Sequence, residues 1–336
     1  MPFDDIVGHQ RQLEYLRRSL ECDRLHHAYL FVGPEGVGKK TVALALAKSL
    51  HCAQRRFDFC DACQVCLTIR AGNHPDVRLV ERLTGKKDIS IGQIRDLEKA
   101  LAFRSFSGRR KVTLIDGADL MNFPAQNALL KTLEEPPGNA LIFLIAKSMG
   151  GLLPTVLSRC VRLFFGLTPV EAVADFLMRH KGLTRERARL VASVTMGSVG
   201  EALGCDESEV LEQRRGWIER VSSLPQGGYR EAMALAEEAA GDRERCFRVL
   251  RWVEGWYRDV LIYQLAGETG MLRNVDMVET IRKQAIDRGR CHILFVLSSL
   301  ARLGEELQRN YNRRLALEHC LVRIMDRERT ATAGPS

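Results

Sequence analysis

The chain has 336 residues, 46% of them hydrophobic and 27% charged, a composition that excludes wholesale disorder. The longest apolar run, residues 140–146, is too short to cross a bilayer, and the segment MPFDDIVGHQ has no basic region followed by an apolar stretch. We therefore expect a cytoplasmic protein with no membrane contact. The net charge of +8, from 50 Lys and Arg against 42 Asp and Glu, permits contact with nucleic acid without establishing it.

Short apolar runs alternate with helical patterns in the first half of the chain. Strands are predicted at residues 28–32, 77–80, 111–115, 141–146 and 161–165. Helices are predicted at residues 41–50, 91–103 and 125–133, the last of them ended by Pro136 and Pro137. Strands that alternate with helices indicate an α/β domain with a parallel sheet covered on both faces.

Strand-like runs largely disappear after Thr168 and Pro169. Three short helices are predicted at residues 170–180, 184–195 and 198–203, and an almost entirely helical pattern follows from residue 207, with breaks near 225–228 and 267–270. We expect an α/β domain at 1–166, a small three-helix domain at 167–206, an all-helical domain at 207–328 and a disordered tail at 329–336.

A phosphate-binding loop is predicted between the first strand and the helix that follows it. The segment GPEGVGK has glycines at Gly33, Gly36 and Gly38 and ends at Lys39, which is the pattern G-x-x-x-x-G-K. Glycines let the backbone wrap closely around phosphates, and the N–H groups at the start of the helix face the anion. Lys39 is expected to reach the outer phosphates.

One position of this loop departs from an ordinary ATPase. The pattern places Ser or Thr directly after the lysine, where its hydroxyl holds Mg²⁺, but here that residue is Lys40 and the hydroxyl comes one place later, at Thr41. One step along a helix rotates a side chain by about 100°, so Thr41 should point away from the metal. We expect nucleotide binding to be weakened or independent of metal, and hydrolysis to suffer more.

A second departure lies at the end of the strand at 111–115. A hydrolytic site of this kind needs an acid there for the metal and usually a carboxylate beside it to orient water. Asp116 supplies the first acid, but the next residue is Gly117, which offers no base, and Asp119 is a candidate cap or surface charge. Both departures predict a degenerate nucleotide site.

Four of the ten cysteines lie close together in the sequence. Cys52, Cys60, Cys63 and Cys66 have a spacing that can place four thiolates around one tetrahedral Zn²⁺. Four protein ligands close the site, so its role would be structural. His51 is a possible substitute ligand, and the alternative is four buried thiols, although the polar residues between the cysteines argue against that.

Taken together, these segments resemble bacterial clamp-loader subunits of the AAA+ class. The resemblance rests on FDDIVG at 3–8, the phosphate loop, the cysteine cluster inserted after its helix, AQNALLKTLEEPP at 125–137 and LSRC at 157–160. It covers roughly the first 205 residues and implies a P-loop AAA+ domain with a zinc module at 52–66, followed by a small helical lid and a C-terminal helical collar for oligomerisation.

Within this family, the gamma or tau subunits are catalytic and the delta-prime subunits are not. A catalytic subunit would have Lys-Thr or Lys-Ser in the loop, Asp-Glu at the strand end and an arginine in the lid stretch, which here reads GSVG at 197–200. The chain is therefore most similar to delta-prime.

This resemblance implies a non-hydrolysing stator of the DNA polymerase III clamp loader, which acts in DNA replication while other subunits polymerise. Its partners would be the gamma/tau and delta subunits and, through the complex, the sliding clamp and primed DNA. The resemblance also implies that Arg159 is an arginine finger that reaches the ATP of a neighbouring subunit.

Two other interpretations stay open. One is an active gamma/tau-type ATPase, which would hydrolyse ATP as a purified chain with Mg²⁺ and primed DNA. The other is a zinc-stabilised nucleic-acid-binding protein with a vestigial phosphate loop, whose DNA affinity would fall steeply with salt. Whether ATP or ADP binds without turnover is not decided by the sequence.

Overall fold

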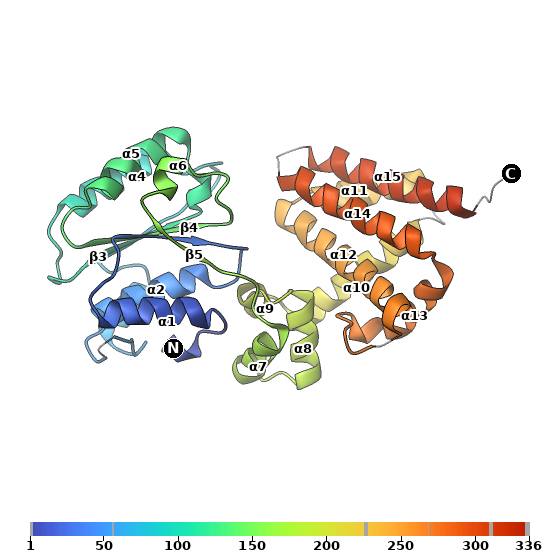
Figure 1. Cartoon of the computed structure of the whole chain (residues 1–336), viewed down its shortest axis with the longest axis horizontal. Helices are drawn as coiled ribbons and strands as arrows, with labels where there is room; N and C mark the ends of the chain where they lie inside the picture. Colours follow the sequence, from blue (N-terminus) through green and yellow to red (C-terminus); the bar gives the residue numbers. More distant parts are fainter. Residues whose placement is uncertain (1–2, 56, 225–227, 268, 309–311, 333–336) are drawn as a thin grey trace. The chain divides into compact units, whose positions relative to one another are not determined.

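A computed structural model describes the chain apart from residues 1–2, 56, 225–227, 268, 309–311 and 333–336 (Figure 1). The chain divides into two compact units, residues 1–182 with 195–203, and residues 183–194 with 204–336. Among the described residues, we find no helix with the length and apolar character needed to span a membrane.

The first unit is built on a parallel five-stranded sheet with the strand order β2-β3-β4-β1-β5. Its strands are β1 (Ala28–Val32), β2 (Val77–Val80), β3 (Lys111–Asp116), β4 (Ala140–Ala146) and β5 (Val161–Phe164). All five confirm the predicted strands to within one residue at each end. Every residue of β1 and β4 is buried, which explains why both read as continuous apolar runs.

Helices cover both faces of this sheet (Figure 1). One face packs against α1 (Gln10–Glu21), α2 (Lys39–His51) and α3 (Gln64–Arg70), and the other against α4 (Ile91–Ala102), α5 (Phe123–Glu134) and α6 (Pro154–Leu157). The helices α2, α4 and α5 confirm three predicted helices, whereas α1, α3, α6 and the short 3₁₀ turns η1 (Phe3–Asp5) and η2 (Ala118–Leu120) were not predicted. The predicted α/β class is thus confirmed.

The three short helices predicted after Pro169 are present as α7 (Val170–Lys181), α8 (Arg185–Val194) and α9 (Val199–Gly204). The division between the two units runs through this region. α7 and residues 195–203 belong to the first unit, and residues 183–194, which contain α8, belong to the second.

The described residues of the second unit form helices and the turns that connect them, with no strand. The unit contains α8 together with α10 (Glu207–Ser223), α11 (Tyr229–Ala240), α12 (Arg243–Ala266), η4 (Val275–Met277), α13 (Val278–Asp287), α14 (Arg290–Gln308) and α15 (Arg313–Thr332). Its apolar core is built around the fully buried Trp256 and Tyr257 of α12. The unit also buries a charge, because Arg214 donates to the side chains of Asn274 and Asp276 while only 1% exposed.

The predicted breaks and tail overlap the residues that the structure leaves out. Residues 225–227 and 268 lie outside the described residues, and Gly267 ends α12 in a left-handed conformation with φ of 65°. Helix α15 runs to Thr332, so the first part of the predicted tail is helical and residues 333–336 lie outside the description.

Candidate functional site

The phosphate loop joins the carboxyl end of β1 to the start of α2, and two of its glycines are required by their surroundings. A Cβ added to Gly33 would lie 2.0 Å from the carbonyl oxygen of Phe165. Gly36 has φ of +73°, and its added Cβ would lie 2.2 Å from Oγ of Ser198. Gly38 has φ of +102° and caps α2 in the left-handed conformation that favours glycine.

Lys39 is folded back onto the loop itself. Its side chain is buried, and Nζ donates to the carbonyl oxygen of Gly33 at 2.6 Å and to that of Pro34. Burial lowers the pKa of Lys39, and the carboxylate of Asp116 opposes that shift. The ammonium group of Lys39 is therefore hydrogen-bonded to carbonyls of its own loop.

Lys40 lies beside the acid that the sequence assigns to a metal. Its Nζ pairs with Oε1 of Glu81 and lies 3.5 Å from Oδ2 of Asp116. Burial raises the pKa of Asp116, and the charge of Lys40 opposes that rise. Lys40 thus brings a positive charge to this acid. Thr41 is exposed in the first turn of α2.

Glu81 was missed by sequence reasoning, although one signal was available. It directly follows β2, and the carboxyl ends of parallel strands meet at one edge of a sheet. At the end of β3, Gly117 has φ of +82° and caps η2, so the residue after Asp116 turns the chain and offers no carboxylate.

Residues 195–203 lie against the phosphate loop. The N–H of Gly200 donates to the carbonyl oxygen of Gly36 at 2.9 Å, and a Cβ on Gly200 would lie 3.1 Å from that oxygen. On another side of the loop, Nε2 of His9 lies 2.8 Å from the carbonyl oxygen of Val37. The stretch GSVG at 197–200 therefore closes over the loop by backbone contact, a role for Ser198 and Gly200 that sequence reasoning missed.

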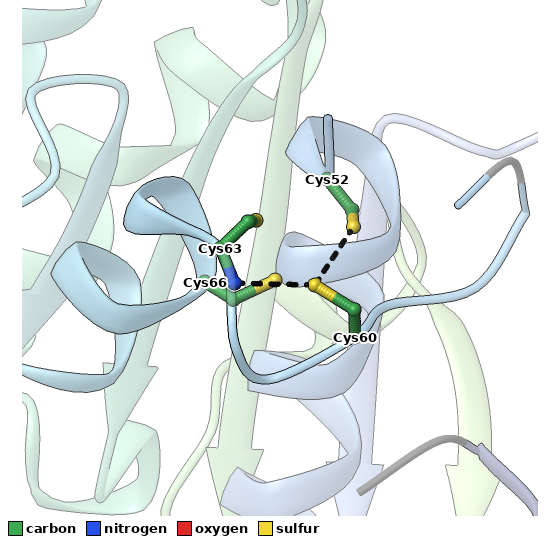
Figure 2. A group of neighbouring side chains, drawn as sticks. All are labelled: Cys52, Cys60, Cys63 and Cys66. Atoms are coloured by element: carbon green, nitrogen blue, oxygen red, sulfur yellow. Dashed lines mark hydrogen bonds between the residues drawn. The ribbon is translucent and has the colours of Figure 1, made fainter. Parts of the chain in front are cut away.

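The four predicted cysteines gather at the end of α2 and the start of α3 (Figure 2). Their ligand atoms all lie within 4.8 Å of one another. The sulfurs of Cys52 and Cys60 are 3.7 Å apart, and the N–H of Cys63 donates to Sγ of Cys60 at 3.3 Å. Two sulfurs on one tetrahedral Zn²⁺ at about 2.3 Å would be about 3.8 Å apart, so this donor set fits a metal.

The surroundings of these thiols shift their pKa values in opposite directions. The N–H groups of Ala62 and Cys63 lower the pKa of Cys60. For Cys63, burial acts to raise the pKa, but N–H donors from Cys66 and Ala53 lower it to about 6. Burial raises the pKa of Cys66 to about 12. Backbone N–H groups thus lower the pKa of two of these thiols, and burial raises the pKa of a third.

His51 lies in a different group from the cysteines. Its ring centroid is 4.8 Å from that of His74, beside Asp76. Asp76 accepts hydrogen bonds from the backbone N–H groups of Phe106 and Ser107 and from the hydroxyls of Ser105 and Ser107. Because these donors occupy the carboxylate and His74 Nδ1 accepts from the Asp76 N–H, we interpret this second group as a structural brace.

Arg159 follows α6 and is held by three acceptors. Its Nη1 donates to the carbonyl oxygen of Thr155 at 2.8 Å and to Oγ of Ser158 at 3.3 Å. Its Nη2 forms an ion pair with Oε1 of Glu134 at 2.6 Å, and the Arg159 side chain remains 34% exposed.

The sheet register separates Arg159 from this chain's own phosphate loop. β5 runs parallel to β1 with Val161 opposite Tyr29 and Phe164 opposite Val32, and the loop follows Val32. Val161 therefore lies about 10 Å back from the edge that carries the loop, and Arg159 precedes it. Arg159 emerges at the amino edge of the sheet, opposite to the phosphate loop.

Known proteins match this chain over most of its length. A family model described as DNA polymerase III, delta subunit, matches residues 8–168. DNA polymerase III subunit delta' of Pseudomonas aeruginosa is 32% identical over 303 residues, which cover 88% of this chain and 90% of that protein. The chain belongs to the delta-prime family of DNA polymerase III subunits. The delta' subunit of Bacillus subtilis is 28% identical over 323 residues, covering 94% of this chain and 96% of its own.

A tau subunit also matches, but less completely. DNA polymerase III subunit tau of Bacillus subtilis is 30% identical over 239 residues, which are 70% of this chain and 37% of that protein. The predicted resemblance to clamp-loader subunits, and to delta-prime among them, is confirmed by these matches.

The predicted site residues of this delta-prime family member fall into three places. The first, at the carboxyl edge of the sheet, contains Gly33, Gly36, Gly38, Lys39, Lys40, Thr41 and Asp116. The second is the cysteine cluster, and the third is Arg159, at the edge of the sheet opposite the phosphate loop.

Proposed function

We propose that this chain is the stator of a DNA polymerase III clamp loader and hydrolyses little or no ATP itself. In this proposal it assembles in the cytoplasm with gamma/tau-type and delta subunits, and the complex opens the sliding clamp and places it on primed DNA. Residues 1–166 form the AAA+ domain, 167–206 the lid and 207–328 the collar that joins the subunits. Support comes from the delta-prime family membership of the chain.

The pairing of Lys40 with Asp116 is the observation that carries this proposal. A hydrolytic site needs a divalent cation beside that acid to neutralise charge on the transferring phosphoryl group. Here an ammonium lies 3.5 Å from Oδ2 of Asp116, and Gly117 leaves no base to orient water. If ATP or ADP is held by the glycines and Lys39, we expect it to remain unhydrolysed.

Arg159 is the residue that we assign to chemistry in a neighbouring subunit. An arginine supplied in trans stabilises the charge that develops on the phosphoryl group, and its loss costs about 10³–10⁵ in rate. Support comes from its position, because it is partly exposed at the edge of the sheet opposite its own phosphate loop.

The test is the Arg159→Ala variant in a clamp loader reconstituted with its ATPase partners. We expect ATP turnover at the site that this chain faces to fall by about 10³, with assembly intact. Arg162→Ala removes the same charge from an exposed position of β5 and serves as the matched control. Unchanged turnover in the Arg159 variant, with normal assembly, rejects the finger.

The competing interpretation is an active gamma/tau-type ATPase. The intact glycines and Lys39 favour it, as does the match to a tau subunit. The purified chain alone, given Mg²⁺ and primed DNA, decides between the two. We expect phosphate release at background level, and brisk magnesium-dependent release would replace the stator proposal with the ATPase.

We also propose that Cys52, Cys60, Cys63 and Cys66 hold one structural Zn²⁺. Bound there, the ion would supply charge neutralisation to the thiolates and a crosslink between the end of α2 and the start of α3. Metal analysis of the purified chain tests this, with one zinc per chain expected. A metal-free chain with four titratable thiols and unchanged stability would contradict it.

A further inference from the structure

Glu134 makes the one ion pair of Arg159 found among the described residues. It is the last residue of α5, and its Oε1 lies 2.6 Å from Nη2 of Arg159. The two residues are far apart in the sequence, and each belongs to a segment on which the family resemblance rests, TLEEPP and LSRC. Sequence reasoning did not connect them, because nothing in either segment points to the other.

Three acceptors hold the two terminal nitrogens of the Arg159 guanidinium. Thr155 and Ser158 accept from Nη1, and Glu134 accepts from Nη2. A guanidinium has five N–H groups, so at least two remain for an incoming anion. Glu134 also stands at the C-terminus of α5, where the partial negative charge of the helix favours a cation.

This arrangement reduces the freedom of a long side chain. A partly exposed arginine otherwise samples many rotamers, and each must be given up when it meets a ligand. Groups that hold a side chain in its working geometry before the ligand arrives remove part of that entropic loss.

We propose that Glu134 is a positioning residue, which fixes the guanidinium of Arg159 for the nucleotide phosphates of a neighbouring subunit. This inference rests on the proposed function of Arg159 as a finger in trans. The Glu134 carboxylate itself touches no substrate, and it acts by setting the direction in which the free N–H groups of Arg159 point.

The Glu134→Gln variant tests this in the reconstituted clamp loader with ATP, the sliding clamp and primed DNA. We expect kcat for ATP at the site that this chain faces to fall about three- to fivefold, the range for a partly exposed ion pair. We expect KM and subunit assembly to stay unchanged, and the thermal midpoint of the chain to fall by no more than about 3 °C. Glu134→Asp keeps the carboxylate and should restore at least half of the lost kcat.

Two further variants make the result decisive. Glu135→Gln removes the same charge from the exposed neighbouring residue and should match the unmodified chain. Arg159→Ala in the same assay separates the two proposals. If Arg159→Ala lowers kcat and Glu134→Gln leaves it unchanged or raises it, the positioning role is rejected and the finger stands. If Arg159→Ala has no effect, the proposed finger in trans is itself rejected, and the positioning role falls with it.

Discussion

The two edges of the parallel sheet use their charged side chains in different ways. At the carboxyl edge, Lys39 bonds the carbonyls of its own loop and Lys40 pairs with Glu81 and lies beside Asp116, so the charges satisfy one another. At the amino edge, Asp76 holds residues 105–107 and Arg159 stays partly exposed. The charged side chains around the phosphate loop are thus bonded to groups of this chain, whereas the guanidinium of Arg159 is partly exposed at the opposite edge.

The cysteine cluster is tied to the amino edge of the sheet. Nη1 of Arg109, two residues before β3, donates to the carbonyl oxygens of Leu50 and Cys52 at the end of α2. One helix, α2, therefore begins at the phosphate loop and ends at the cysteines. The comparison shows that the backbone of the phosphate loop can be kept while the charged side chains around it pair with one another.

Removal of a metal from the cysteine cluster should have the largest effect on stability. If zinc is bound, free metal at a thousand times its Kd stabilises the fold by about 4 kcal/mol, and a chelator removes that contribution. Thermal unfolding with and without chelator measures it, and Cys63→Ser should reproduce the loss. Cys22→Ser changes an exposed cysteine outside the cluster and should have no effect. Equal midpoints with and without chelator would contradict a structural metal.

The carboxyl edge can be disturbed through Gly36. Gly36→Ala forces a Cβ into a backbone with φ of +73°, 2.2 Å from Oγ of Ser198, so we expect a loss of about 3 kcal/mol. Gly72→Ala is the matched control, because Gly72 has φ of +74° with open space around its Cβ, and should cost about 1 kcal/mol. Chemical denaturation of both variants measures the difference, and equal losses would show that residues 195–203 do not press on the loop.

The brace at Asp76 predicts a pH dependence. Burial acts to raise the pKa of this carboxyl, but hydrogen bonds from Ser105, Phe106 and Ser107 lower it to about 2 from an ordinary 3.8. A depressed pKa stabilises the fold above the unfolded value and loses this contribution as pH falls from about 4 to 2. Asp76→Asn should therefore cost about 2 kcal/mol at pH 7, and less at pH 3.

Denaturation of Asp76→Asn at the two pH values measures this effect. Asp96→Asn, at an exposed position, is the control and should behave like the unmodified chain at both. A loss that is independent of pH would mean that the ionised form of Asp76 is not what braces residues 105–107.

The smallest effect is expected at Lys39. Because the phosphate loop of this chain is proposed not to support ATP hydrolysis, Lys39→Met should change ATP turnover of the reconstituted clamp loader by less than about twofold. Methionine keeps most of the volume of a side chain that is 7% exposed. A tenfold fall with assembly intact would show that nucleotide on this chain contributes to turnover. That result would contradict the proposal that the phosphate loop takes no part in hydrolysis.

Much of this architecture could be predicted because its signals are local. The runs AYLFV and LIFLIA are buried at every position and bounded by turn residues, so they predict strands directly. Helix α1 was missed because His9, its N-cap, gives no capping hydrogen bond and stands in a left-handed conformation, so no start signal is present. Helix α6, from Pro154 to Leu157, is too short to show a helical period.

The site residues also divide into those with a local sequence signal and those without one. The loop glycines and the four cysteines are each close in sequence, and their spacing alone predicts what they form. Glu81, Ser198 and Glu134 were missed because each meets its partner from a distant segment, at Lys40, Gly36 and Arg159. Such contacts depend on strand order and helix packing, which a single sequence does not encode at any one place.

The hydrogen bond from Gly200 to Gly36 has a consequence for ligand affinity. If a phosphate chain needs a free Lys39 and a released Gly36 carbonyl, it binds an open form in which the bonds of Lys39 to Gly33 and Pro34 and of Gly200 to Gly36 are broken. The apparent dissociation constant of any nucleotide then equals its intrinsic value divided by the fraction of molecules in the open form. The same factor weakens the binding of ATP and of ADP, so closure of the loop lowers the occupancy of the site by either nucleotide without changing the preference between them.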